Sequence, residues 1–112
     1  MSSTVTRHLP LLQLLSQSTA QRRRKLIELL TQREVNCVAE VILNGIAGEP
    51  RSRLSPECVR HCRRNRRAVR SLAYERQPWT RRRDTLKKQA GRGWMAPLLS
   101  TVIASLSGSE NE

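Results

Sequence analysis

Aliphatic side chains must carry the packing of this chain, because it has no Phe and only three aromatic residues. A chain of 112 residues buries only about 60–70% of its unfolded surface, so its core is thin. The aliphatic residues recur at helical spacing, and strand-type alternation is missing throughout. We therefore expect an all-α protein: a small bundle of about five or six short helices, with a basic amphipathic helix and an apolar C-terminal helix.

The charge divides the chain into three segments. Residues 1–50 carry a net +2 and form the N-terminal helical segment, whereas residues 51–92 hold fifteen Arg or Lys and a net +12. Residues 93–112 carry −2 and form an apolar amphipathic segment with an acidic tail. The middle segment is predicted to bind nucleic acid, an anionic lipid surface or an acidic protein. Most of its cations are Arg, whose planar fork suits phosphate.

Three short helices are predicted within residues 1–50. Pro10 fits the first turn of the first helix, and Ser18 or Thr19 caps the second. Gly48 and Pro50 end the third. The predicted buried stripes of the second and third helices consist of Leu26, Ile27, Leu29, Leu30, Val35, Val38, Ala39, Ile42 and Ile46.

A single basic helix is predicted from the cap at Ser55 to the break at Gln77 and Pro78. Its apolar side carries Cys58, Cys62, Val69, Leu72 and Ala73. Within about 120° on the other side lie Arg60, Arg63, Arg64, Arg67 and Arg70. Ordinary solvated helices interleave Glu with Arg, and here the balancing acids are missing. This face is therefore predicted to bind a polyanion.

A second basic helix, capped by Thr80, is predicted to extend the same surface. Its candidate nucleic-acid contacts are Arg81, Arg82, Arg83, Lys87 and Lys88. Binding would rest on phosphate neutralisation with little base reading, and double-stranded DNA is the expected ligand, with RNA as the alternative that the sequence leaves open. The runs "RRRK" at 22–25 and "RRNRR" at 63–67 also fit nuclear import signals. "GRG" at 91–93 is expected to end the helix with flexible backbone.

The apolar segment after residue 93 has two interpretations. Its one-sided set consists of Trp94, Met95, Leu98, Leu99, Val102, Ile103 and Leu106. These side chains either close the helical core or insert into a membrane surface, with Trp94 at the boundary of the basic run. About a dozen apolar residues fall short of the roughly 17–25 that a spanning helix needs.

Catalysis, cofactors and metals are not expected. "CVRHC" places Cys58, His61 and Cys62 on adjoining turns, with Cys37 and His8 as further candidates. Structural zinc motifs show two ligand pairs, so core cysteines are the favoured interpretation and no metal is expected. No phosphate loop or nucleophile motif is present, so we expect no enzyme and no cofactor. Three cysteines without a signal peptide favour an intracellular protein that is not secreted.

Three stretches in this order resemble small basic proteins of adenovirus-related mobile elements and viruses, the polinton and adintovirus group. They are "RRRKLIELLTQREVNCVAEVILNGIAGE", "LSPECVRHCRRNRRAVRSLA" and "TRRRDTLKKQAGRGWMAPLLSTVIASL", and together they span roughly residues 20 to 106. The shared features are a turn from Asn44 to Gly48, a capped basic helix over 54–72, and a basic run into a leucine-rich tail over 81–106. Where that group has a Gly-Gly hinge, this chain has Gly91-Arg92-Gly93.

The resemblance implies a virion component condensed with viral DNA, comparable in role to adenovirus core proteins. Such a protein would be found in the virion and the host nucleus, with capsid protein or an anionic membrane as a further partner and homo-oligomers as an option. The tail is similar to the membrane-lytic, melittin-like segments of such particles. The alternative functions are a membrane-active protein that uses the apolar helix and an interaction module for an acidic protein.

Overall fold

The computed structural model describes residues 6–46 and 54–108, with side chains up to residue 105. This part of the chain is helical and contains no strand, which confirms the all-α prediction. In chain order the helices are α2 (Leu9–Gln17), α3 (Ala20–Glu28), α4 (Gln32–Ile46), α5 (Pro56–Arg64), α6 (Arg66–Ser71), α7 (Trp79–Gln89) and α8 (Met95–Gly108). The described residues thus form seven helices rather than the predicted five or six, because the predicted basic helix is divided in two.

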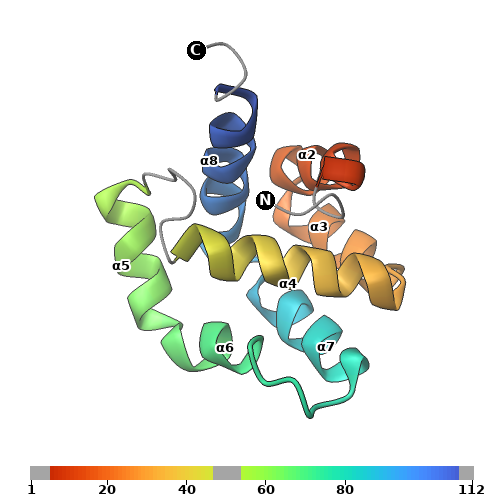
Figure 1. Ribbon diagram of the computed structural model, residues 1–112. Helices are drawn as coiled ribbons and strands as arrows, with labels where there is room; N and C mark the ends of the chain where they lie inside the picture. Colours follow the sequence, from red (N-terminus) through yellow and green to blue (C-terminus); the bar gives the residue numbers. More distant parts are fainter. Residues whose placement is uncertain (1–5, 47–53, 109–112) are drawn as a thin grey trace.

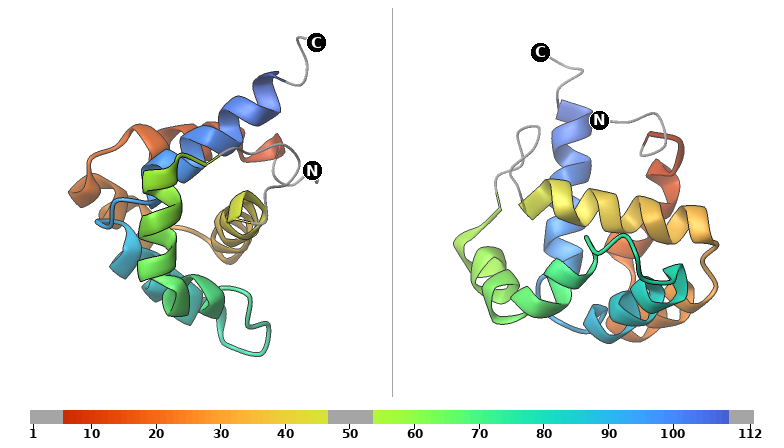
Figure 2. Two further views of the ribbon diagram at one scale, coloured as in Figure 1. Left: turned by 90° about the vertical axis from the view of Figure 1, so that its left-hand side faces the viewer. Right: turned by 60° about the horizontal axis from the view of Figure 1, so that its bottom comes forward.

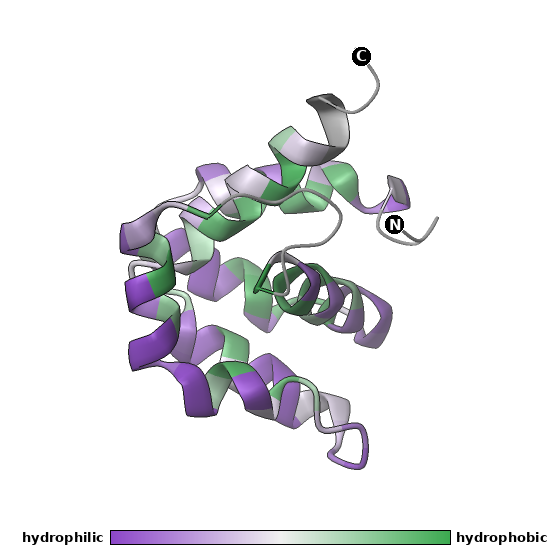
Figure 3. Cartoon of the chain, turned by 60° about the vertical axis from the view of Figure 1, so that its left-hand side comes forward, coloured by the Kyte–Doolittle hydropathy of each residue, from purple (hydrophilic) through white to green (hydrophobic). Residues whose placement is uncertain are grey.

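Helix α4 crosses the middle of the molecule and packs against both α7 and α8 (Figure 1). Helix α2 lies along α8, and α3 lies along α7, so segments distant in sequence are paired. Helices α5 and α6 follow one another along one edge (Figures 1 and 2). Figure 3 shows hydrophilic positions over much of α5 and α6, whereas α8 is mostly hydrophobic. Among the described helices, none combines the length and the hydropathy needed to cross a membrane.

Every described helix contributes to one core, with aliphatic residues from all of them except α5, which contributes Cys58 and Cys62. The largest fully buried side chain of the core is Trp94, whose indole Nε1 donates a hydrogen bond to Oε1 of the buried Gln89 at 2.9 Å. Gly45 lets α4 and α8 approach closely, because a Cβ there would lie 2.9 Å from Cγ2 of Val102 and 3.0 Å from Cδ2 of Leu98. The packing of α8 on α4 therefore depends on a position without a side chain.

Two predicted helix caps are confirmed. The Thr19 hydroxyl accepts from the backbone N–H of Arg22 at 3.2 Å, and the Ser55 hydroxyl accepts from that of Cys58 at 3.1 Å. Sequence reasoning missed a capping box before α4, where Thr31 and Glu34 each bond the other's backbone N–H. The predicted cap at Thr80 is wrong, because Pro78 occupies the cap position and α7 begins at Trp79.

Three residues predicted on buried faces are exposed. Leu29 is 80% exposed because α3 ends at Glu28, and the chain turns at Leu29 before the stripe is complete. Ile46, the last described residue of α4, is 39% exposed, and Ala73 follows the end of α6 on the surface. The other members of these predicted faces are buried, apart from the partly buried Leu26. The predicted stops at Gly48 and Pro50 lie outside the described residues.

The prediction of one continuous basic helix is wrong, because the helix breaks at Asn65. This residue has φ −109° and ψ 22°, and it separates α5 from α6. Its side-chain amide donates to the backbone carbonyl of His61 at 2.8 Å, a local bond that competes with helix continuation. The buried side chains on either side of the break, Cys62 and Val69, both reach the core. The break at Asn65 therefore keeps both α5 and α6 packed on the bundle, whereas one straight helix would extend away from its surface.

Candidate nucleic-acid interface

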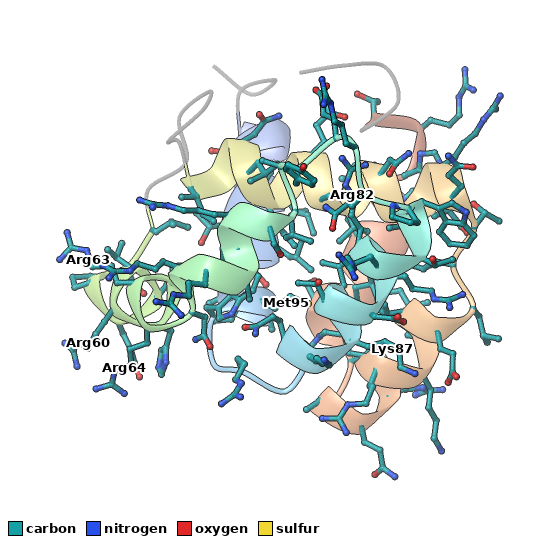
Figure 4. All side chains as sticks on the ribbon, turned by 90° about the horizontal axis from the view of Figure 1, so that it is seen from below. Arg60, Arg63, Arg64, Arg82, Lys87 and Met95 are labelled. Atoms are coloured by element: carbon teal, nitrogen blue, oxygen red, sulfur yellow. The ribbon has the colours of Figure 1, made fainter. Side chains whose placement is uncertain are left out.

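Six exposed arginines on α5 and α6 form what we call the α5–α6 arginine surface. Its members are Arg60, Arg63, Arg64, Arg66, Arg67 and Arg70. Figure 4 shows Arg60, Arg63 and Arg64 pointing away from the body of the molecule. Five of the six were predicted from helical geometry. Arg66 was missed because a continuous helix would place it off the basic face.

The break at Asn65 gathers cations from both helices around one hollow. Arg63 and Arg64 come from the end of α5, and Arg66 and Arg67 from the start of α6. Together with Asn65 and Ala68 these residues line a hollow of about 440 Å³. The predicted single stripe of arginines is thus replaced by a compact cluster, which brings more charge to one place.

No carboxylate of the described residues pairs with the α5–α6 arginine surface. The nearest acid in sequence, Glu57, lies at the start of α5, and its Oε1 is 3.9 Å from Nε2 of His61. Ion pairs elsewhere involve α3 and α7. Mutual repulsion of six unpaired guanidinium groups opposes folding, so an anionic ligand that neutralises them would stabilise the protein.

Helix α5 packs against the segment that connects α7 to α8. The Cys58 thiol donates to the backbone carbonyl of Trp94 at a distance of 3.6 Å. Gly93 faces the His61 ring so closely that a Cβ there would lie 3.1 Å from Nε2. Gly91 is similarly close to Arg24, because a Cβ at Gly91 would lie 3.3 Å from Nη2 of Arg24. The lack of a side chain at Gly91 and Gly93 therefore permits close approach of α3 and α5, and the expected flexibility of this segment stays a prediction.

The three cysteines are buried free thiols. Burial, the neighbouring Cys58 and a hydrogen bond with it raise the pKa of Cys62 to about 12. Burial also raises the pKa of Cys58, and burial with nearby Glu40 and Glu34 raises that of Cys37 to about 11. Within the described residues, no three His, Cys, Asp or Glu side chains are grouped to hold a metal ion.

Arg82 was predicted to contact nucleic acid, but its guanidinium binds the protein itself. Its Nε donates to the carbonyl of Leu72 at 3.0 Å, and Nη1 donates to Oδ1 of Asn36 at 2.9 Å. Its Nη2 donates to the carbonyl of Tyr74 at 3.2 Å. Arg82 therefore ties α7 to α4 and to the end of α6, and it is not a free cation.

Of the other four cations predicted on α7, two interact with protein side chains and two are exposed. Arg83 is partly buried, with its guanidinium 5.3 Å from the centre of the Trp79 ring. Lys87 pairs with Glu28 of α3, with 3.3 Å between Nζ and Oε1. Arg81 and Lys88 are exposed. Of the five predicted contacts, Arg81 and Lys88 are thus the two that are exposed to solvent. Neither belongs to the α5–α6 arginine surface.

The run of cations at residues 22–25 contains a structural arginine that sequence reasoning missed. Arg23 is 5% exposed, and its Nε donates to the carbonyl of Leu15 at 2.7 Å. Its Nη1 donates to the carbonyl of Ala90 at 2.8 Å, and Nη2 donates to that of Ser18. Burial lowers its pKa below the ordinary value. The signal was present, since Arg23 lies one helical turn before Ile27 on the buried face.

The apolar C-terminal segment lies inside the protein. Five of its predicted contact residues have no exposed surface, namely Trp94, Met95, Leu98, Leu99 and Val102. Ile103 is partly buried against the same core, and the side chain of Leu106 lies outside the described residues. In this fold these five side chains are not exposed to a membrane surface, and α2 and α4 pack against α8, which carries four of them. Their burial agrees with the alternative interpretation, in which the segment closes the core.

A scan of protein-family models, a search of curated proteins and a search of solved structures each found no match to this chain.

Proposed function

We propose that this protein binds nucleic acid through the α5–α6 arginine surface. The observation that carries the proposal is the set of six exposed guanidinium groups that pair with no carboxylate of the described residues. Each guanidinium can donate two hydrogen bonds to a phosphate, and the hollow beside Asn65 brings four of them together.

Double-stranded nucleic acid is the favoured ligand. Proteins that hold single strands stack bases on aromatic side chains. Of the three aromatics, Trp94 is buried and Trp79 packs beside Arg83, which leaves Tyr74 exposed. A surface of arginines without such a platform suits a duplex backbone, and it gives binding that depends little on base sequence.

The resemblance of residues 20 to 106 to small basic proteins of the polinton and adintovirus group supports a more specific role. We propose genome packaging in a virion core, where dense, sequence-independent phosphate binding is needed. An acidic protein is the alternative partner, because carboxylates can also pair with arginine forks. Competition between duplex DNA and poly-glutamate for the protein separates these two ligands.

The test is an anisotropy titration with two scrambled duplexes of equal length. If all six arginines neutralise a phosphate, affinity should fall roughly 10³-fold between 50 and 200 mM salt, and equally for both sequences. Replacing Arg60, Arg63, Arg64 and Arg67 by Gln should flatten this salt dependence and leave helix content largely intact. Salt-independent binding, or strong preference for one duplex, would overturn the proposal.

A further inference from the structure

A second cationic groove lies between α3 and α7, apart from the α5–α6 arginine surface. It has a volume of about 540 Å³ and is lined by Arg24, Asp84, Lys87, Lys88 and Arg92. Figure 4 shows Lys87 on the far side of the molecule from Arg60, Arg63 and Arg64, with Met95 between them. The groove is therefore a separate feature, built from cations that the nucleic-acid proposal does not use.

A buried hydrogen bond joins the two segments that line the groove. Arg23 bonds the carbonyl of Ala90, so α3 is fixed against the end of α7. The next residue in each segment, Arg24 and Gly91, meet at the surface, where Gly91 leaves room for the Arg24 guanidinium. The Arg23–Ala90 bond thus holds the backbone next to Arg24 close to the segment that carries Arg92, and such preorganisation favours ligand binding.

Three cations in the groove have no carboxylate partner among the described residues. Lys87 is neutralised by Glu28, and Asp84 lies 3.8 Å from the Nε of Arg83. This leaves Arg24, Lys88 and Arg92. The end of helix α7 nearby contributes about half a negative charge, and it already accepts a bond from Arg23 at Ala90. The three cations without a carboxylate partner therefore still outweigh the negative charge of the helix end.

We propose that this groove binds a multiply charged phosphate chain, such as a diphosphate or triphosphate. Its volume falls within the range of about 300–1,000 Å³ typical of small-ligand sites. Two arginine forks and a lysine can bond several phosphate oxygens at once. The chain could belong to a free polyphosphate, to a nucleotide, or to successive phosphates of a nucleic-acid backbone. The inference does not rest on the function proposed for the α5–α6 arginine surface.

The first experiment measures tripolyphosphate binding by calorimetry at constant ionic strength. Replacing Arg24 and Arg92 by Gln should weaken binding at least about tenfold, since two close charges are lost. The matched control replaces Arg60 and Arg64 by Gln, which removes the same charge outside the groove and should change affinity less than twofold. Equal weakening by both pairs, or no binding by the unaltered protein, overturns the proposal.

A gain of affinity provides a test that misfolding cannot imitate. Asp84→Asn removes the one carboxylate on the groove, so it should tighten tripolyphosphate binding about threefold. Glu75→Gln gives the same change of net charge at an exposed site away from the groove, and it should leave affinity within about 1.5-fold. An equal gain of tripolyphosphate affinity in both variants would show that binding depends only on the total charge of the protein, and it would overturn the proposal that the groove binds phosphate.

The source of the phosphate is resolved in the variant that lacks Arg60, Arg63, Arg64 and Arg67. Retained tripolyphosphate binding with lost duplex binding supports a groove for free or nucleotide phosphates. Retained binding of both, with competition between them, supports a groove for backbone phosphates. If this variant no longer binds tripolyphosphate, the proposal that the groove binds phosphate is wrong. If it binds duplex as tightly as the unaltered protein, and tripolyphosphate does not compete, only the proposal of nucleic-acid binding by the α5–α6 arginine surface is wrong.

Discussion

The guanidinium of Arg23 donates a 2.8 Å hydrogen bond to the carbonyl of Ala90, 67 positions later in the chain. With its bonds to the carbonyls of Leu15 and Ser18, this side chain joins the ends of α2 and α7. Carbonyls at helix ends have no partner within their helix, and buried ones must find another donor. One arginine in a run of four cations is therefore part of the core.

Replacing Arg23 by Met should lower the free energy of unfolding by about 1–3 kcal/mol. Methionine preserves much of the apolar stem but leaves three carbonyls without their donor. Urea denaturation followed by circular dichroism measures the change. Arg22→Met, at an exposed position on the same helix, should stay within about 0.5 kcal/mol. Similar effects at both positions would show that the Arg23 bonds contribute little.

Replacing Arg82 by Gln should also destabilise the protein, by about 1–3 kcal/mol, because its three bonds to Leu72, Asn36 and Tyr74 are lost. Its neighbour Arg81 is exposed, so Arg81→Gln removes the same charge at little cost in stability. Thermal unfolding of the two variants provides the measurement. A lower melting temperature for Arg81→Gln than for Arg82→Gln would contradict the assigned structural role of Arg82.

Two leucines that were both predicted on apolar helix faces should respond differently to truncation. Leu98 is fully buried against α4, so Leu98→Ala should cost about 2–5 kcal/mol. Leu29 is 80% exposed, so Leu29→Ala should change the free energy of unfolding by less than about 0.5 kcal/mol. Chemical denaturation compares them directly. A neutral Leu98→Ala would mean that α8 does not close the core in solution.

Stability should fall with pH above about 9 because of the buried thiols. The pKa of Cys62 is about 12 in the folded protein against 9.0 ordinarily, so the folded state keeps a proton that the unfolded state loses. The contribution is complete below pH 9 and is lost as the pH rises towards 12. Each such thiol adds a slope of at most about 1.4 kcal/mol per pH unit.

The measurement is urea unfolding at several pH values between 8 and 11, for the unaltered protein and for Cys62→Ala. Lysine and tyrosine also titrate in this range, so the informative quantity is the difference between the two slopes. The Cys62→Ala protein should lose stability less steeply. Parallel slopes would indicate that the folded protein does not retain the Cys62 proton.

The sequence by itself determined the helical class, the caps at Thr19 and Ser55, and most of the buried stripes. These features depend on local spacing, since side chains one helical turn apart share a face whatever surrounds them. The same reasoning located five of the six arginines on α5 and α6, because long charged side chains without partners remain at the surface.

Only the tertiary structure decided which cations are free and which are bound internally. The guanidinium groups of Arg23 and Arg82 donate hydrogen bonds to carbonyls and to a side-chain amide on other segments, and no local sequence pattern reveals these partners. The burial of Trp94, the close approach of Gly91 to Arg24 and that of Gly93 to His61 likewise depend on neighbours distant in the chain. Spacing along a helix predicts a face, but the opposing segment determines whether that face meets water, protein or ligand.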